Sequence, residues 1–136
     1  MTYAIKAEVS VPVAVTLSFP AAKTMYGGKR IKKGDTIYIF ASENSGGSGL
    51  VAAGTVTAAS AVPLKPNIER QTPRVSLVVK RTALATRRLG RAELKSFADW
   101  SDGRPETELN FKFYRQATDK IVGLTDPTAA FLHGFF

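Results

Sequence analysis

Two runs of residues that favour β-strands, joined by a loop of small polar residues, occupy the stretch IKKGDTIYIFASENSGGSGLVAAGTV, residues 31–56. Residues 36–41 carry apolar side chains on both alternating faces, which predicts a central strand. Residues 49–60 have the pattern of its antiparallel partner, with Gly54 as a bulge in the ladder. The loop at 42–48 therefore joins two central strands. It is either a long hairpin connection or the rim of a binding site.

The remaining strands and helices are short. Strands are expected at residues 3–9, 11–19, 74–85, 110–116 and 119–125, and helices at 20–26, 91–100 and 126–134. In the last helix Asp126 is the expected cap and Pro127 stands at the first position. Five or six strands with two or three small helices predict one α+β domain over residues 1–136. Its sheet is a strongly bent mixed β-sheet or small barrel with short flanking helices.

The composition limits the possible functions. The chain has 136 residues, of which 44% are hydrophobic, and it contains no cysteine. Disulfides, thiolate metal sites and a cysteine nucleophile are therefore excluded. The net charge of +8 favours a polyanionic partner, although many small basic domains bind no anion. The basic residues cluster at Lys29, Arg30, Lys32 and Lys33 and again at Lys80, Arg81, Arg87, Arg88 and Arg91.

The N-terminal residues do not have the pattern of a signal peptide. No window of the sequence approaches the roughly 20 consecutive apolar residues of a membrane span. We therefore expect a cytoplasmic protein that makes no membrane contact.

Three stretches, taken in order, resemble the EVE family of the PUA-like superfamily, which also contains the ASCH and YTH domains. Residues 31–56 are similar to the family's K-x-G-D-x-V-x-F-Y strand, small polar loop and following strand. Residues 74–97 are similar to its long strand, basic turn and helix. Residues 113–132, FYRQATDKIVGLTDPTAAFL, are similar to its closing segment. The first third departs from the family pattern, because YAIKAEV keeps only Lys6 and Glu8 of a Lys-x-Glu-Pro turn.

The resemblance implies a PUA-like pseudobarrel with a cleft. The cleft of such a domain accepts a nucleobase, often a modified one, in single-stranded or flipped-out RNA or DNA. No cofactor, metal site or catalytic residue is expected.

Base recognition needs an aromatic surface for stacking, polar groups that read the base edge, and cations that contact the phosphates. We expect stacking from aromatic residues, hydrogen bonding from the 42–44 loop, and further contacts from cations beside them. The candidate ligand-binding residues are Lys6, Tyr26, Arg30, Ser42, Glu43, Asn44, Trp100, Tyr114 and Arg115. Each also has a plain structural explanation, such as a lid over the core, a turn former or a solvated face.

Two functions from other classes remain open. Residues 20–30, PAAKTMYGGKR, are similar to the Lys-Thr segment of ASCH domains, which implies a hydrolase of acylated nucleosides that uses Lys23 and Thr24. Tyr26 stands where those domains have an acidic residue. The third alternative is an accessory domain that binds a protein or small molecule. The chain is expected to be a monomer or a homodimer, since Phe135 and Phe136 need cover.

Overall fold

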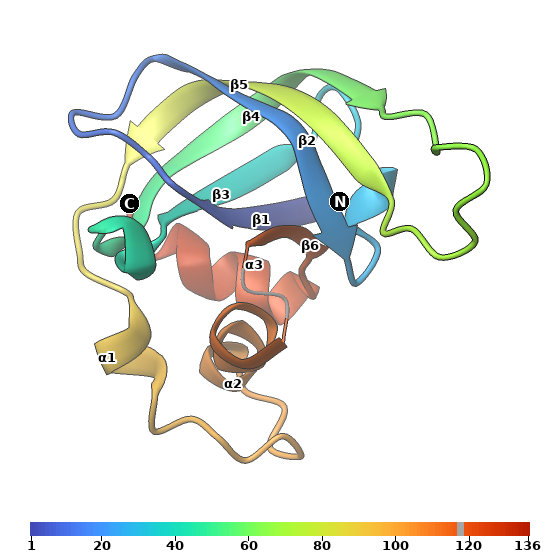
Figure 1. The fold of residues 1–136 in the computed structure, drawn as a ribbon. Helices are drawn as coiled ribbons and strands as arrows, with labels where there is room; N and C mark the ends of the chain where they lie inside the picture. Colours follow the sequence, from blue (N-terminus) through green and yellow to red (C-terminus); the bar gives the residue numbers. More distant parts are fainter. Residues whose placement is uncertain (117–118) are drawn as a thin grey trace.

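Six strands close into a barrel, and the helices gather on one side of it (Figure 1). This computed structural model describes residues 1–116 and 119–136. The strands are β1 (Thr2–Ala7), β2 (Thr16–Met25), β3 (Thr36–Ala41), β4 (Gly49–Ala61), β5 (Arg74–Leu84) and β6 (Lys120–Gly123). The α-helices are α1 (Arg91–Leu94), α2 (Pro105–Leu109) and α3 (Asp126–His133). Two short 3-10 helices, η1 (Gly28–Arg30) and η2 (Glu43–Ser45), and one π-helix, η3 (Asn110–Gln116), complete the fold.

The barrel is a mixed sheet in the order β1-β3-β4-β5-β2-β6. Strand β1 runs parallel to β3, and β2 runs parallel to β6, while the other neighbours are antiparallel. The α+β pseudobarrel with short flanking helices is therefore confirmed. The predicted bulge at Gly54 is also present, since the β4–β5 register shifts between Ala53 and Gly54.

Alternation along β1 and β3 divides the apolar residues into two cores. Tyr3, Ile5, Ile37 and Ile39 point into the barrel, where they pack with the inner residues of β4 and β5. Their neighbours in sequence face the other way, so that Ala4, Tyr38 and Phe40 pack against the helices. Both faces of these strands are buried, which is why residues 36–41 carry apolar groups on both sides.

The predicted helix at residues 20–26 is wrong, because this segment is the second half of β2. The β2–β5 pairing is interrupted between Phe19 and Ala22. At the interruption Ala21 adopts a positive φ of 48°, and its N–H donates to the Ser76 hydroxyl at 2.9 Å. Pro20 therefore marks a bulge rather than a first helical position. After the bulge the strand finds partners on both sides, since Lys23 pairs with Arg74 and with Lys120.

The predicted strand at residues 110–116 is also wrong. These residues form η3, a π-helix that continues α2 with turns wider than those of an α-helix. Alternating apolar and polar residues predicted a strand, but Phe113 is buried against Phe40, with 5.0 Å between ring centroids, while Lys112 reaches back to Glu108. The sequence analysis missed α2, although Pro105 at its start and Glu106 and Glu108 in its first turn are helix signals.

Two helix boundaries also differ from the prediction. The helix expected at residues 91–100 is only the single turn Arg91–Leu94. The terminal helix is present, but Thr125 rather than Asp126 is its N-cap residue. Phe135 is 7% exposed and packs in the core beside the helices, so this chain itself covers it. Among the described residues, no helix is long and apolar enough to cross a membrane.

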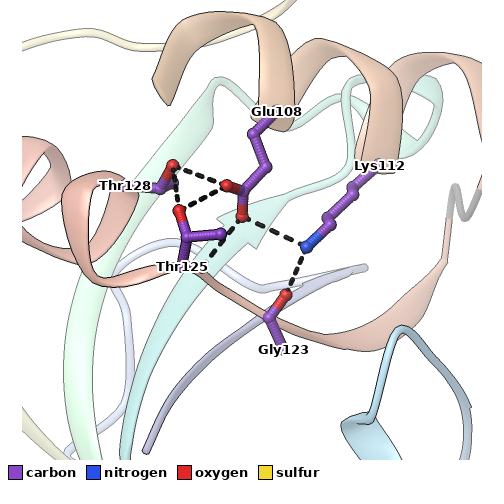
Figure 2. Close-up of polar contacts among 5 residues, drawn as sticks. All are labelled: Glu108, Lys112, Gly123, Thr125 and Thr128. Carbon is purple, nitrogen blue, oxygen red and sulfur yellow. Dashed lines mark hydrogen bonds and ion pairs between the residues drawn. The ribbon is translucent and has the colours of Figure 1, made fainter. Parts of the chain in front are cut away.

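A polar cluster fixes η3 against α3 and β6 (Figure 2). The Glu108 carboxylate accepts hydrogen bonds from the Thr125 hydroxyl at 2.6 Å and the Thr128 hydroxyl at 2.9 Å. Lys112 lies 3.1 Å from the same carboxylate and donates to the Gly123 carbonyl at 2.7 Å. The ion pair is largely buried, with side-chain exposures of 15% and 13%. It thereby holds the helical segment that supplies Phe113, Tyr114 and Arg115.

Glu108→Gln tests this cluster by removing the charge while keeping the shape. Burial alone raises the pKa of Glu108, but hydrogen bonds from Thr125 and the charge of Lys112 outweigh it and leave the pKa below its ordinary value of 4.5. A carboxyl group whose pKa is depressed in the folded state stabilises that state at any pH above the ordinary pKa. This stabilisation is lost as the pH falls through the lower pKa of the folded state. We expect Glu108→Gln to lower the free energy of unfolding by about 3 kcal/mol at pH 7. The difference from the unmodified chain should shrink as the pH falls below 4.5.

Urea unfolding at pH 7 and pH 3.5 measures both effects. Glu106→Gln is the matched control, since the Glu106 carboxylate makes no side-chain hydrogen bond or ion pair with any described residue. The assigned role of the cluster would be contradicted if the two variants lost equal free energy of unfolding. It would also be contradicted if the loss in Glu108→Gln grew toward acid pH.

Candidate functional site

A cavity of about 440 Å³ opens at the end of the barrel where β1 and β3 finish. We call it the barrel-end cavity. Its lining residues come from β1, the β2 bulge, the loop after β3 and the start of β6: Ile5, Lys6, Ala7, Glu8, Ser18, Phe19, Pro20, Ala22, Ser42, Ser45 and Asp119. Its walls therefore combine an ammonium group, two carboxylates, several hydroxyls and an apolar patch.

Lys6 is the most unusual residue of this cavity. It is 1% exposed, and its Nζ atom donates to the Phe113 carbonyl at 2.8 Å. Among the described residues no other acceptor is within hydrogen-bond distance of Nζ, and no carboxylate lies within 4.0 Å. An ammonium group has three N–H donors, and among the described residues only the Phe113 carbonyl accepts a hydrogen bond from them, while the Tyr114 ring covers another side of Nζ. A lysine is almost never this deeply buried without a paired charge, which marks Lys6 as a functional candidate.

Ser42 lies one residue past the end of the β1–β3 ladder. Lys6 pairs with Phe40 and Ala7 pairs with Ala41. The Ser42 N–H then donates to the Ala7 carbonyl at 2.8 Å, which extends the ladder by one residue. Ser42 is 4% exposed and lines the cavity. The strand ends thus bring Ser42 and Lys6 to the lining of the same cavity.

Glu43 ties the 42–48 loop to the helices. One oxygen of its carboxylate accepts hydrogen bonds from the Tyr114 hydroxyl at 2.9 Å and from the Arg91 N–H at 2.9 Å. Arg88 lies 4.0 Å from the other oxygen. Asn44 accepts a bond from the Arg91 guanidinium at 3.3 Å. The loop is therefore a fixed rim of the cavity rather than an idle turn.

Two glycines let this loop close. Gly46 has φ +84° and Gly49 has φ +85°, a region that favours glycine. A Cβ atom on Gly49 would also collide with the Leu89 carbonyl. The glycines therefore allow the backbone conformation of the loop. Ser42 and Ser45 are the loop residues that line the cavity.

Tyr114 forms the wall behind Lys6. Its ring centroid lies 4.4 Å from Lys6 Nζ and 5.6 Å from the Arg91 guanidinium carbon. Burial lowers the pKa of Lys6, although nearby acidic groups partly oppose this. Burial, together with the hydrogen bond to Glu43, raises the pKa of Tyr114 well above its ordinary range. The Tyr114 hydroxyl therefore stays protonated and donates to Glu43 at every physiological pH.

Other predicted site residues lie on a different side of η3. Trp100 packs edge-on against Phe111, with 4.8 Å between ring centroids, and Tyr26 packs against the same ring at 5.8 Å. Arg115 stacks over Trp100 at 5.2 Å from the ring centroid. These residues form a separate aromatic cluster, so the nine candidates do not surround one cavity.

Arg30 lies away from both groups. It ends η1, which follows the glycine turn after β2 and precedes the start of β3. Its neighbours Lys29, Lys32 and Lys33 lie at that same end, whereas Arg88 and Arg91 contact the residues just past the end of β3. Arg88 and Arg91 therefore lie at the other end of β3 from Arg30, whereas Lys80 pairs with Thr55, which in turn pairs with Thr36 at the start of β3.

The structure thus brings Lys6, Ser42, Glu43, Asn44 and Tyr114 together and separates Tyr26, Trp100 and Arg30 from them. Arg115 contacts Trp100 and also lines a separate hollow with Tyr114. Sequence reasoning missed several residues at the cavity and its rim, among them Phe19, Ser45, Arg91 and Asp119. Asp119 and Phe19 carried no sequence signal, because only the barrel closure brings β6 and the β2 bulge to this end.

Lys23 and Thr24, the residues of the hydrolase alternative, do not share a site. The Thr24 hydroxyl is buried and donates to the Pro73 carbonyl at 2.8 Å. Lys23 is exposed and lines a different hollow beside the β4–β5 connection.

No family model matches the sequence, and neither does any curated protein. Solved structures do match. The crystal structure of the DUF55 domain of human thymocyte nuclear protein 1 has a TM-score of 0.67 at 15% identity, covering 98% of this chain and 97% of that one. The same human protein in complex with DNA containing 5-methylcytosine has a TM-score of 0.66 at 15% identity, with coverages of 98% and 95%.

A protein from Pseudomonas putida matches with a TM-score of 0.64 at 15% identity, over 99% of both chains. This chain has the fold of a DUF55 domain. DUF55 domains are PUA-like domains of the EVE type, so the fold implied by the sequence resemblance is confirmed.

Tyr114→Phe tests the hydrogen bond that ties the 42–48 loop to η3. The substitution removes the hydroxyl that donates a hydrogen bond to the charged Glu43 carboxylate. We therefore expect the free energy of unfolding to fall by about 1.5 kcal/mol. Tyr26→Phe is the control, because the Tyr26 hydroxyl donates no hydrogen bond to any described residue. Urea midpoints measure both variants. Equal stability of Tyr114→Phe and the unmodified chain would contradict the rim assignment.

Proposed function

We propose that this chain is a non-catalytic nucleic-acid-binding domain that recognises a nucleobase in RNA or DNA, with a modified base as its favoured target. The base is single-stranded or flipped out of a duplex and enters the barrel-end cavity. The observation that carries this proposal is the buried Lys6 ammonium, which donates to a single described acceptor and has no carboxylate within 4.0 Å among the described residues.

The groups in the cavity match the edge of a cytosine-type base. Such a base presents a carbonyl oxygen and a ring nitrogen as acceptors and an amino group as donor. Lys6 supplies donors for the acceptors, and Ser42 can both donate and accept. Asp119 and Glu8 line the same cavity and supply acceptors for the amino group. Phe19 and Pro20 form an apolar surface suited to a methyl substituent.

A structural relative supports the choice of ligand. Human thymocyte nuclear protein 1, which shares this fold, has been crystallised with DNA containing 5-methylcytosine. The cavity volume of about 440 Å³ lies within the range of ordinary ligand pockets. The fold and the polar cavity together make 5-methylcytosine the first base to test.

The rival functions have less support. The hydrolase needs Lys23 and Thr24 to act together, and their side chains are engaged elsewhere. No observation favours the accessory domain that binds a protein or small molecule. A cytoplasmic location, and the choice between a monomer and a homodimer, stay predictions.

Lys6→Met tests the proposal directly. Methionine keeps the length of the side chain but removes the donors, so binding of a single-stranded DNA heptamer with a central 5-methylcytosine should weaken at least about tenfold. Fluorescence anisotropy of the labelled heptamer measures the affinity. Circular dichroism melting confirms that the variant is folded.

Lys23→Met is the matched control, since it removes the same charge from an exposed position at another hollow. It should retain nearly the full affinity. Equal losses of heptamer affinity in both variants would mean that net charge determines binding, whatever its position, and would contradict the proposal. Unchanged binding by Lys6→Met would overturn it.

A further inference from the structure

A second hollow, of about 390 Å³, lies on the other side of the Tyr114 ring. Its lining residues are Arg91, Leu94, Lys95, Asn110, Tyr114 and Arg115, which include three cations and no carboxylate. We call it the basic hollow. Tyr114 separates it from the barrel-end cavity, because the same ring contacts Lys6 Nζ, 4.4 Å from its centroid. The two sites are therefore neighbours.

Arg115 connects the basic hollow to Trp100. The guanidinium carbon of Arg115 lies 5.2 Å from the centroid of the Trp100 ring. Trp100 is 54% exposed and is held edge-on by Phe111, with 74° between the ring planes. Trp100 and Phe111 also line a groove of about 550 Å³ with Arg104. A large, fixed and half-exposed indole ring is a surface that a second aromatic group can cover.

The cationic side chains of this hollow form no ion pair with a described carboxylate. None of the described carboxylates lies within 4.0 Å of a side-chain nitrogen of Arg91, Lys95 or Arg115. Arg104, in the adjoining groove, likewise forms no ion pair with a described residue. By contrast, Lys112 and Arg88 each lie within ion-pair distance of a glutamate. The cations of the basic hollow are thus available to phosphates.

We propose that the basic hollow and Trp100 bind the unpaired nucleotides that flank the recognised base. This inference rests on the proposed function and adds the substrate class, which is single-stranded nucleic acid. A phosphate lies in the hollow between Arg91, Lys95 and Arg115, and the next base stacks on the indole ring of Trp100. Stacking on a side chain requires a base that is free of its own duplex, so a paired flank cannot make this contact.

The chain contains one tryptophan, so its intrinsic fluorescence reports on this site alone. Hexathymidylate is the probe, because it lacks the modified base and tests the flank site independently of base recognition. We expect it to quench the Trp100 emission, and a thymidylate–adenylate duplex long enough to stay fully paired in the assay to quench much less. Hexaglutamate, an acidic peptide, should not quench. Quenching by the duplex or the peptide equal to that by hexathymidylate would overturn the inference.

Variants separate the stacking from the charge contribution. Trp100→Ala should weaken binding of the heptamer with a central 5-methylcytosine about tenfold, at the low end of what one stacked base contributes. Arg115→Gln should reduce the salt dependence, lowering the slope of log K against log salt by about 0.7 for one lost phosphate contact. Lys33→Gln is the matched control, since it removes one exposed charge at the opposite end of β3 and should leave the slope unchanged.

Isothermal titration with the free nucleoside 5-methyl-2′-deoxycytidine distinguishes this inference from the proposed function. A nucleoside has no flank, so Trp100→Ala should bind it as the unmodified chain does. If the nucleoside binds but Trp100→Ala and Arg115→Gln bind the heptamer normally, the flank site is wrong and the base reader stands. If hexathymidylate quenches Trp100 but Lys6→Met leaves heptamer binding unchanged, the base reader is wrong and the single-strand site stands.

Discussion

The docking of η3 onto the outer face of β1 and β3 determines where the groups of the candidate site lie. Phe113 is fully buried against Phe40, and its carbonyl oxygen accepts the hydrogen bond from Lys6. Burying a phenylalanine side chain contributes roughly 2–3 kcal/mol, which helps to offset the cost of keeping an ammonium group away from water. The same helical segment supplies Lys112 for the Glu108 cluster and Tyr114 for the rim. The barrel alone would leave Lys6 without its acceptor.

The barrel was predictable from the sequence, whereas η3 was not. Residues 36–41 and 49–60 have strand periodicity, a glycine-rich connection and a glycine bulge, and these local signals agree with one another. Residues 110–116 alternate apolar and polar side chains like a strand, yet α2 leads into them and the wide turn of a π-helix fits Phe113 into the core. The bulge in β2 was missed because Pro20 is equally suited to a helix start. In both places tertiary contacts overrode the local pattern.

For the site, the sequence predicted the residues next to strand ends better than those in loops. Lys6 and Ser42 lie at the ends of β1 and β3, which pair in parallel, so strand pairing brings both residues to the same end of the barrel. Trp100 and Tyr26 lie in turns whose positions only the packing of Phe111 fixes. The cations of this region are divided between two hollows. One buried lysine faces the barrel-end cavity, while the exposed cations lie beyond Tyr114. Such a division suits base contacts that specify and phosphate contacts that position.

A crystal structure of this chain with a short single-stranded DNA that carries one 5-methylcytosine tests the central claim most directly. The base should occupy the barrel-end cavity, with Lys6 Nζ within about 3.2 Å of an acceptor on the base and the methyl group against Phe19. A base bound elsewhere, with Lys6 still bonded only to the Phe113 carbonyl and the cavity filled by solvent, would contradict it.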